Sequence, residues 1–153
     1  MAIASVLTNS FKTELLKGLH SFDTSGATPA GSVFKIALYN SSASLGTTTT
    51  AYTTTQELAT ATGYTRPGNT LTNTGVGTTT VTSFTDFSDT SWTSASFTAR
   101  GCLIYNSSTI TGLTTDAAVC YIDFGGDKTV SSGTFTIQFP TNDSSSAIIR
   151  ITS

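Results

Sequence analysis

Two apolar runs decide how this chain folds: Phe97-Thr-Ala-Arg-Gly-Cys-Leu-Ile-Tyr-Asn106 and Ala117-Ala-Val-Cys-Tyr-Ile-Asp-Phe124. Residues 107–116 between them are mainly Ser, Thr, Gly and Asp, which predicts a β-hairpin with a longer loop. With the loop centred on residue 111, Cys102 lies opposite Cys120. A two-residue shift keeps every side chain on its face but separates the cysteines. Because both runs are almost continuously apolar, both faces of the hairpin are predicted to be covered.

The rest of the chain reads as short strands separated by turns. Strands are predicted over residues 33–39, 70–73, 78–87, 92–99, 135–139 and 147–151. Such a pattern is typical of a mainly β, sandwich or jelly-roll-like domain. We expect a single domain over residues 1–153, with a helix and its following turn at 10–22 and the β-sandwich at 32–153.

Three short stretches predict local details of the strands: a bulge, a turn and the face on which a side chain lies. Gly101 interrupts the first apolar run and predicts a β-bulge or a close backbone approach. Residues 125–128, Gly-Gly-Asp-Lys, predict a turn. Within residues 92–99, strict alternation places Trp92 on the face opposite Ala95, Phe97 and Ala99.

The only predicted helix covers residues 10–19. Its apolar positions recur at three- and four-residue spacing and predict one apolar face, formed by Phe11, Leu15, Leu16, Leu19 and Phe22. The N-cap is predicted at Thr8, Asn9 or Ser10, and Lys17 with Gly18 suits the C-terminal end. Such a helix can pack across one sheet or dock on another subunit, and the two roles are compatible.

Composition points away from several functional classes. Charged residues make up 10% of the chain, against ~25% in ordinary soluble domains. Low charge with abundant Ser and Thr suits a protein embedded in a packed assembly. The seven basic residues are scattered, so no nucleic-acid partner is predicted. No apolar run approaches the ~20 residues of a membrane span, and the first ten residues do not resemble a signal peptide.

Residues that carry chemistry are few. His20 is the single histidine and is predicted to be a cap or packing residue, not a catalyst. No nucleophile elbow, P-loop or Rossmann glycine triplet occurs, so no catalytic or cofactor-binding residues are predicted. Asp86 with Asp89, and Asp123 with Asp127, are predicted to be solvated turn aspartates, with calcium binding as the alternative. No metal site is predicted.

Cys102 and Cys120 both lie in apolar strands. Buried free thiols are common and inert, and reduced structural cysteines are the favoured interpretation. A directly opposed pair can oxidise outside a reducing cytoplasm if its geometry allows, so a cross-strand disulfide stays open.

A surface turn is predicted at residues 63–68, where Pro67 restricts the backbone. It is expected to carry Tyr64 and Arg66 outward, and these residue types are enriched at interface anchors. Trp92 at a strand end and Arg100 at the bulge complete the set of predicted interface residues.

Several motifs resemble small structural proteins of tailed-bacteriophage virions, a group that includes cyanophage-type head decoration, or cement, proteins. The motifs are Phe11-Lys12-x-Glu14-Leu15-Leu16-x-Gly18-x-His20, Phe34-Lys35-Ile36-Ala37-Leu38-Tyr39, Gly63-Tyr64-Thr65, Asn69-Thr70-Leu71, and Thr98-Ala99-Arg100-Gly101 followed by Tyr105-Asn106. The resemblance runs along most of the chain.

The resemblance implies a non-enzymatic protein of the capsid surface, made in the host cytoplasm and without cofactors. Its implied partners are the major capsid protein and further copies of itself, for example as a trimer. A tail, baseplate or fibre component with an adhesive or receptor-binding role is the alternative. A carbohydrate-binding or glycan-cleaving domain is the most distant one, and would need exposed aromatic side chains beside paired carboxylates.

Overall fold

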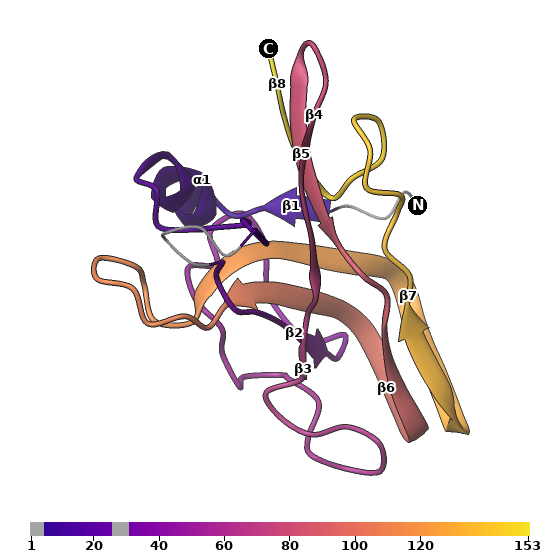
Figure 1. Cartoon of the computed structure of the whole chain (residues 1–153). Helices are drawn as coiled ribbons and strands as arrows, with labels where there is room; N and C mark the ends of the chain where they lie inside the picture. Colours follow the sequence, from indigo (N-terminus) through magenta and orange to yellow (C-terminus); the bar gives the residue numbers. More distant parts are fainter. Residues whose placement is uncertain (1–4, 26–30) are drawn as a thin grey trace.

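The computed structural model describes residues 5–25 and 31–153, so parts of the N-terminal stretch and of the 21–31 loop lie outside the described residues (Figure 1). The chain is mainly β, as predicted, with two antiparallel sheets and one short helix near the N-terminus. The five-stranded sheet has the order β1-β7-β6-β2-β3, and the three-stranded sheet has the order β4-β5-β8. The elements are β1 (Ser5–Leu7), α1 (Asn9–Leu16), β2 (Phe34–Tyr39), β3 (Asn69–Thr70), β4 (Asn73–Thr78), β5 (Thr82–Phe87), β6 (Thr90–Asn106), β7 (Ala117–Ile137) and β8 (Ile149–Thr152).

The predicted hairpin is formed by β6 and β7 at the centre of the five-stranded sheet. Its register differs from the prediction by two residues, because Cys102 pairs with Ile122 and Cys120 pairs with Ile104. The expected direct opposition of Cys102 and Cys120 is therefore wrong. One residue of this difference comes from Val119, which is inserted in β7 between the partners of Ile104 and Tyr105. The other comes from the loop, whose centre lies between residues 111 and 112 because Asn106 pairs with Ala117.

Both faces of the central hairpin are covered, as predicted. Side chains alternate between two apolar clusters, because successive residues of a strand point to opposite faces. One cluster contains Phe34, Ile36, Leu38, Cys102 and Ile104. The other contains Ala37, Tyr39, Leu103, Tyr105 and Ala118, over which Ala43, Leu45 and Tyr52 of the following loop pack.

The outer half of the hairpin is irregular. Residues are inserted around Ser94 in β6 and Ser132 in β7, both of which have positive φ angles of 50° and 49°. The insertion in β6 puts Trp92 in the same apolar cluster as Ala95 and Ala99. The predicted opposition of Trp92 to these residues is wrong, because one inserted residue reverses the alternation.

The stretch Gly125-Gly126-Asp127-Lys128 is not a turn, contrary to the prediction. β7 continues through it, and several residues of β7 bulge out opposite the single residue Arg100 of β6. Gly125 has a φ of 73°, which glycine adopts without steric cost. The bulge predicted at Gly101 is confirmed at this same place.

The bulge bends the hairpin sharply. The ring centroids of Phe124 and Phe135 are 6.2 Å apart, although eleven residues of straight strand would span ~36 Å. The bend therefore creates a concave side, on which the aromatic residues of β7 face one another.

The three-stranded sheet packs on the five-stranded sheet only at its base. Phe87 of β5 and Ile149 of β8 belong to the large apolar cluster, and the ring of Phe87 lies 5.4 Å from that of Phe34. This contact gives a two-layer, sandwich-like arrangement. The outer parts of β4, β5 and β8 project beyond the body of the molecule (Figure 1).

Helix α1 is shorter than predicted. Thr8, one of the three predicted N-caps, accepts a hydrogen bond from the Phe11 N–H at 3.1 Å. The helix ends before Gly18, whose φ is 73°. The predicted apolar face is only partly right: Phe11 is fully buried, but Leu16 is 91% exposed and Glu14 is buried.

Candidate interaction surface

Tyr64 points into the protein, so its predicted outward orientation is wrong. Its side chain is 1% exposed, and its hydroxyl accepts a hydrogen bond from the Leu38 N–H at 3.0 Å. Gly63 causes this orientation, because it has a φ of 80° and a Cβ there would lie 2.5 Å from the Cα of Ala95. The loop can therefore approach β6 closely and insert the next side chain into the core.

The buried carboxylate of Glu57 fixes this loop to the sheet. Its oxygens accept hydrogen bonds from the hydroxyls of Tyr64 at 2.7 Å and Tyr52 at 2.6 Å. Burial, followed by the hydrogen bond to Glu57, raises the pKa of Tyr52, so the phenol stays protonated as a donor. The Nε of Arg66 lies 3.3 Å from the Glu57 carboxylate, and its guanidinium also donates to the Glu57 and Leu58 carbonyls. Arg66 is exposed, as predicted, and its Nε and Nη2 already bind within the chain.

Trp92 is buried, so it is not a surface anchor in this structure. Its side chain is 4% exposed and its ring lies between those of Tyr64 and Phe135, at 6.1 and 6.0 Å. The indole N–H finds no hydrogen-bond partner within the described ranges. The sequence placed Trp92 on the wrong face because the bulge at Ser94 was not visible in the alternation.

Arg100 remains accessible at the hairpin bend. Its Nε donates to the Asp123 carboxylate at 2.9 Å, and its Nη1 lies 4.0 Å from Asp127. The hydrogen bond from Arg100 lowers the pKa of Asp123, and the Gly125 N–H contributes to the same shift. The predicted interface role of Arg66 and Arg100 stays a prediction.

His20 belongs to a buried polar chain. Its Nδ1 lies 3.1 Å from the Asn106 amide nitrogen and its Nε2 lies 3.2 Å from Glu14. Because the Asn106 side-chain oxygen accepts from the Ser108 N–H, the amide nitrogen donates to Nδ1. Nε2 therefore carries the proton and donates to Glu14, whose other oxygen accepts from the Thr114 hydroxyl at 2.6 Å. The Thr114 hydroxyl binds the Glu14 carboxylate and not the His20 imidazole. These hydrogen bonds therefore fasten α1, through Glu14, to the loop after β6.

Burial lowers the pKa of His20, although the hydrogen bond to Glu14 opposes this shift. The neutral imidazole satisfies both of its partners, and the edge of its ring packs on Phe11 at a centroid distance of 4.8 Å. His20 is thus a packing residue, as predicted.

The two aspartate pairs differ in their surroundings. Asp86 is fully buried, which contradicts its prediction as a solvated turn residue, and it accepts hydrogen bonds from the N–H groups of Phe87 and Ile148 at 2.8 and 3.1 Å. Burial raises the pKa of Asp86, and the two N–H groups oppose the shift. Among the described residues, no cluster of three or more His, Cys, Asp or Glu side chains could hold a metal ion.

Both cysteines are buried free thiols, in agreement with the favoured interpretation. Burial raises the pKa of Cys102 well above its ordinary value and that of Cys120 to about 12. Thiolate formation is thereby suppressed at both positions.

The surface that the sequence did not reveal lies on the three-stranded sheet. Val76, Val81 and Ile151 are 63%, 60% and 59% exposed. Val76 pairs with Thr85 and Ile151 pairs with Ser83, two positions apart on β5, so both side chains lie on one face. No charged residue occurs on this face of β4, β5 or β8.

This uncharged face extends toward the helix. A hollow of about 320 Å³ lies beside it and is lined by apolar residues of both regions, among them Leu15, Phe22, Val76 and Ile151, and on the helix side also by Asp23. The outer edges of β4 and β8 pair with no other strand in the described chain. The projecting sheet therefore offers apolar side chains and unpaired backbone groups together. A signal was present in the sequence, because β4 and its turn consist of Asn, Thr, Gly and Val without any charge.

Comparison with protein-family models, with curated proteins and with solved structures finds no match to this chain. In the described parts of the chain, the helix is too short and too polar to cross a membrane.

Proposed function

We propose that this chain is a non-enzymatic structural protein of a tailed-bacteriophage virion, a decoration protein that binds the outer surface of the head. In this role it stabilises contacts between major capsid subunits. The proposal rests on the resemblance of its sequence motifs and on one structural observation: the projecting three-stranded sheet, which exposes an uncharged apolar face and two unpaired edges.

The projecting sheet is suited to contact another protein. Fully burying one Val or Ile side chain contributes about 1.5–3 kcal/mol, and Val76, Val81 and Ile151 are all more than half exposed. An unpaired strand edge can also add to a strand of a partner through main-chain hydrogen bonds. Many identical copies on a symmetric shell would multiply such contacts through avidity.

The disposition of the ionisable groups also supports a structural role. Glu14 and Glu57 each hold a loop or helix in place through several hydrogen bonds, and His20 is held neutral between two partners. These are the groups that would most readily supply acid–base chemistry, and here they serve to fix loops against the five-stranded sheet.

Quantitative mass spectrometry of purified virions tests the proposal by comparing the copy number of this chain with that of the major capsid protein. A ratio near unity is expected for a protein that covers the head lattice. A few copies per particle would instead assign the chain to the tail, baseplate or fibre. Absence from the particles would overturn a virion role.

A variant pair tests the contact surface on particles that lack the native chain. Replacing Val76 and Ile151 together by Ser should reduce occupancy, because both side chains lie on the exposed face. Leu16→Ser is the matched control, since Leu16 is 91% exposed but lies on α1. Equal occupancy for the double variant and the control would reject the three-stranded sheet as the contact element.

A further inference from the structure

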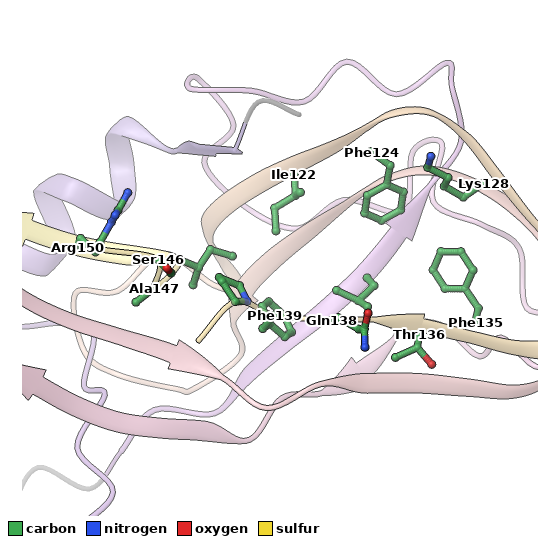
Figure 2. Close-up of a pocket in the computed structure, with 13 residues that line it drawn as sticks. Ile122, Phe124, Lys128, Phe135, Thr136, Gln138, Phe139, Ser146, Ala147 and Arg150 are labelled. Carbon is green, nitrogen blue, oxygen red and sulfur yellow. The ribbon is translucent and has the colours of Figure 1, made fainter. Parts of the chain in front are cut away.

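The bend of the β6–β7 hairpin encloses a hollow that is separate from the projecting face. The hollow has a volume of about 580 Å³ and lies between β7 and residues 138–150. Figure 2 shows side chains of both segments converging on it. Its volume falls within the range of about 300–1,000 Å³ that is common for small-molecule sites.

The walls of the hollow are mainly apolar. Its apolar lining residues are Ile122, Phe124, Phe135, Ile137, Phe139, Pro140, Ala147 and Ile148. Three of them are phenylalanines. Phe124 and Phe135 lie in β7 on either side of the bend, which brings their rings to within 6.2 Å, and Phe139 follows the end of β7. Most of these side chains are half-buried, so apolar surface remains accessible from the hollow.

The charge of the hollow is entirely positive. Lys128 and Arg150 are its only charged lining residues, and no carboxylate is among them. This is notable because the whole chain carries nine acidic and seven basic residues. In Figure 2, Lys128 lies at the end of the hollow beside Phe124 and Phe135, whereas Arg150 lies at the end nearer β8.

The two cations differ in availability. The guanidinium of Arg150 donates to the Ser145 carbonyl, and its charge acts on Asp143 nearby. Lys128 is exposed and forms no ion pair with any residue that the structure describes. Arg150 likewise forms no ion pair among the described residues. The ammonium group of Lys128, however, has no hydrogen-bond partner there and lies beside Phe124 and Phe135, so it is better placed to pair with a ligand whose apolar body contacts these rings (Figure 2).

We propose that this hollow binds a small organic anion with an apolar body, such as a medium-chain fatty acid. The apolar body lies among Phe124, Phe135 and Phe139, and the anionic group pairs with Lys128. Apolar walls with a few placed polar groups are what small-molecule sites use for affinity and orientation, and a charge-assisted hydrogen bond selects the anion. The site is independent of the proposed virion role.

Two dyes that differ in one group test the proposal on the full chain. Anilinonaphthalene sulfonate carries an anionic group, and phenylnaphthylamine has the same ring system without it. We expect the sulfonate dye to bind at one site and the neutral dye to bind about tenfold more weakly. Dodecanoate should displace the sulfonate dye, and dodecyltrimethylammonium should not.

Variants locate the site. Lys128→Ala should weaken binding of the sulfonate dye about tenfold and leave the neutral dye unaffected. Phe135→Leu should weaken both dyes. Lys12→Ala, which removes an exposed cation of α1, is the matched control for charge, and Val76→Ser controls for dye on the projecting face.

Each part of the proposal has a result that would contradict it. Equal affinity for the two dyes, or unchanged sulfonate binding in Lys128→Ala, would overturn the proposed anion recognition. Loss of binding in Val76→Ser would move the dye to the projecting sheet and reject the hollow. Failure of dodecanoate to displace the dye would reject the fatty-acid class, as expected if the hollow instead receives part of another protein.

Discussion

The centre of the β6–β7 hairpin and the outer part of the three-stranded sheet are both antiparallel β-structure, but the former is almost continuously apolar whereas the latter is mainly Thr, Ser and Gly with a few apolar residues. Only the former is covered on both faces: Leu103 and Ile104 are fully buried on opposite sides, whereas Ile151 is 59% exposed. Ile104 and Ile151 are the same residue type in antiparallel strands, so the difference in their burial comes from what packs over each face. Burial of a strand is therefore a property of its neighbours, and exposed apolar strand positions mark the surface that a partner can cover.

The largest effect on the free energy of unfolding should follow from a cavity at the covered centre of the β6–β7 hairpin. Leu103→Ala should lower the free energy of unfolding by about 2–5 kcal/mol, because Leu103 is fully buried between sheet and loop. Ile151→Ala on the exposed sheet should change it by less than about 0.5 kcal/mol. Urea denaturation of both variants measures the contrast, and similar losses would show that the two sheets are equally covered.

A smaller effect on the free energy of unfolding is expected where the loop that carries Tyr64 is fastened to the five-stranded sheet. Tyr64→Phe removes the hydroxyl that joins Leu38 to Glu57 and leaves buried polar groups short of a partner. The expected loss is about 1–3 kcal/mol in the same denaturation assay.

Tyr121→Phe is the matched control for this loss. The Tyr121 hydroxyl forms no hydrogen bond to another described residue, so its removal should be nearly neutral. An equal effect at both positions would mean that the bond to Glu57 contributes nothing.

The buried His20 predicts a dependence of stability on pH. Because burial lowers its pKa, its contribution is complete above its ordinary pKa of about 6.5. The contribution is lost as the pH falls from there through the lowered pKa, by at most about 1.4 kcal/mol per pH unit.

His20→Gln isolates this contribution, since the amide can accept from Asn106 and donate to Glu14 without titrating. The free energy of unfolding of the native chain, measured between pH 8 and pH 5.5, should fall more steeply than that of the variant. Parallel curves would exclude His20 as the titrating group.

The smallest expected difference concerns the reactivity of the two thiols at the covered centre of the β6–β7 hairpin. Cys102 and Cys120 should react with iodoacetamide only after unfolding, because both are buried with raised pKa values. Ser83→Cys would place a third thiol on the exposed sheet and should be alkylated in the native state. Mass spectrometry counts the added groups, and early labelling of the native pair would contradict the burial of the hairpin centre.

The sequence predicted the central hairpin well because its signal is local. Two continuous apolar runs around a polar loop specify strands covered on both faces. The predicted register was wrong by two residues, since neither the inserted Val119 of β7 nor the exact centre of the loop is visible in the sequence.

The errors at the candidate interface arise from contacts between distant segments. The sequence around Tyr64 is typical of a surface turn, but Gly63 allows this loop to approach Ala95 so closely that Tyr64 is buried. Trp92 faces the core because one residue is inserted near Ser94. Leu16 fits a helical apolar face, yet no element covers it. The projecting face of the three-stranded sheet was missed for the same reason, because periodicity shows which residues share a face and not whether anything packs on it.

The order of the strands also has a consequence for how the chain reaches its native state. β1 pairs with β7, with Ser5 opposite Ile122, and β5 pairs with β8, which lies about 60 residues further along the sequence. The five-stranded sheet cannot be completed until β7 has left the ribosome, and the three-stranded sheet cannot be completed until β8 has done so. Such long-range pairings slow folding, since loop closure precedes the contacts that stabilise it. We therefore expect nascent and C-terminally truncated chains to lack the native fold, and the exposed strands of these incomplete chains to be the stage most prone to aggregation.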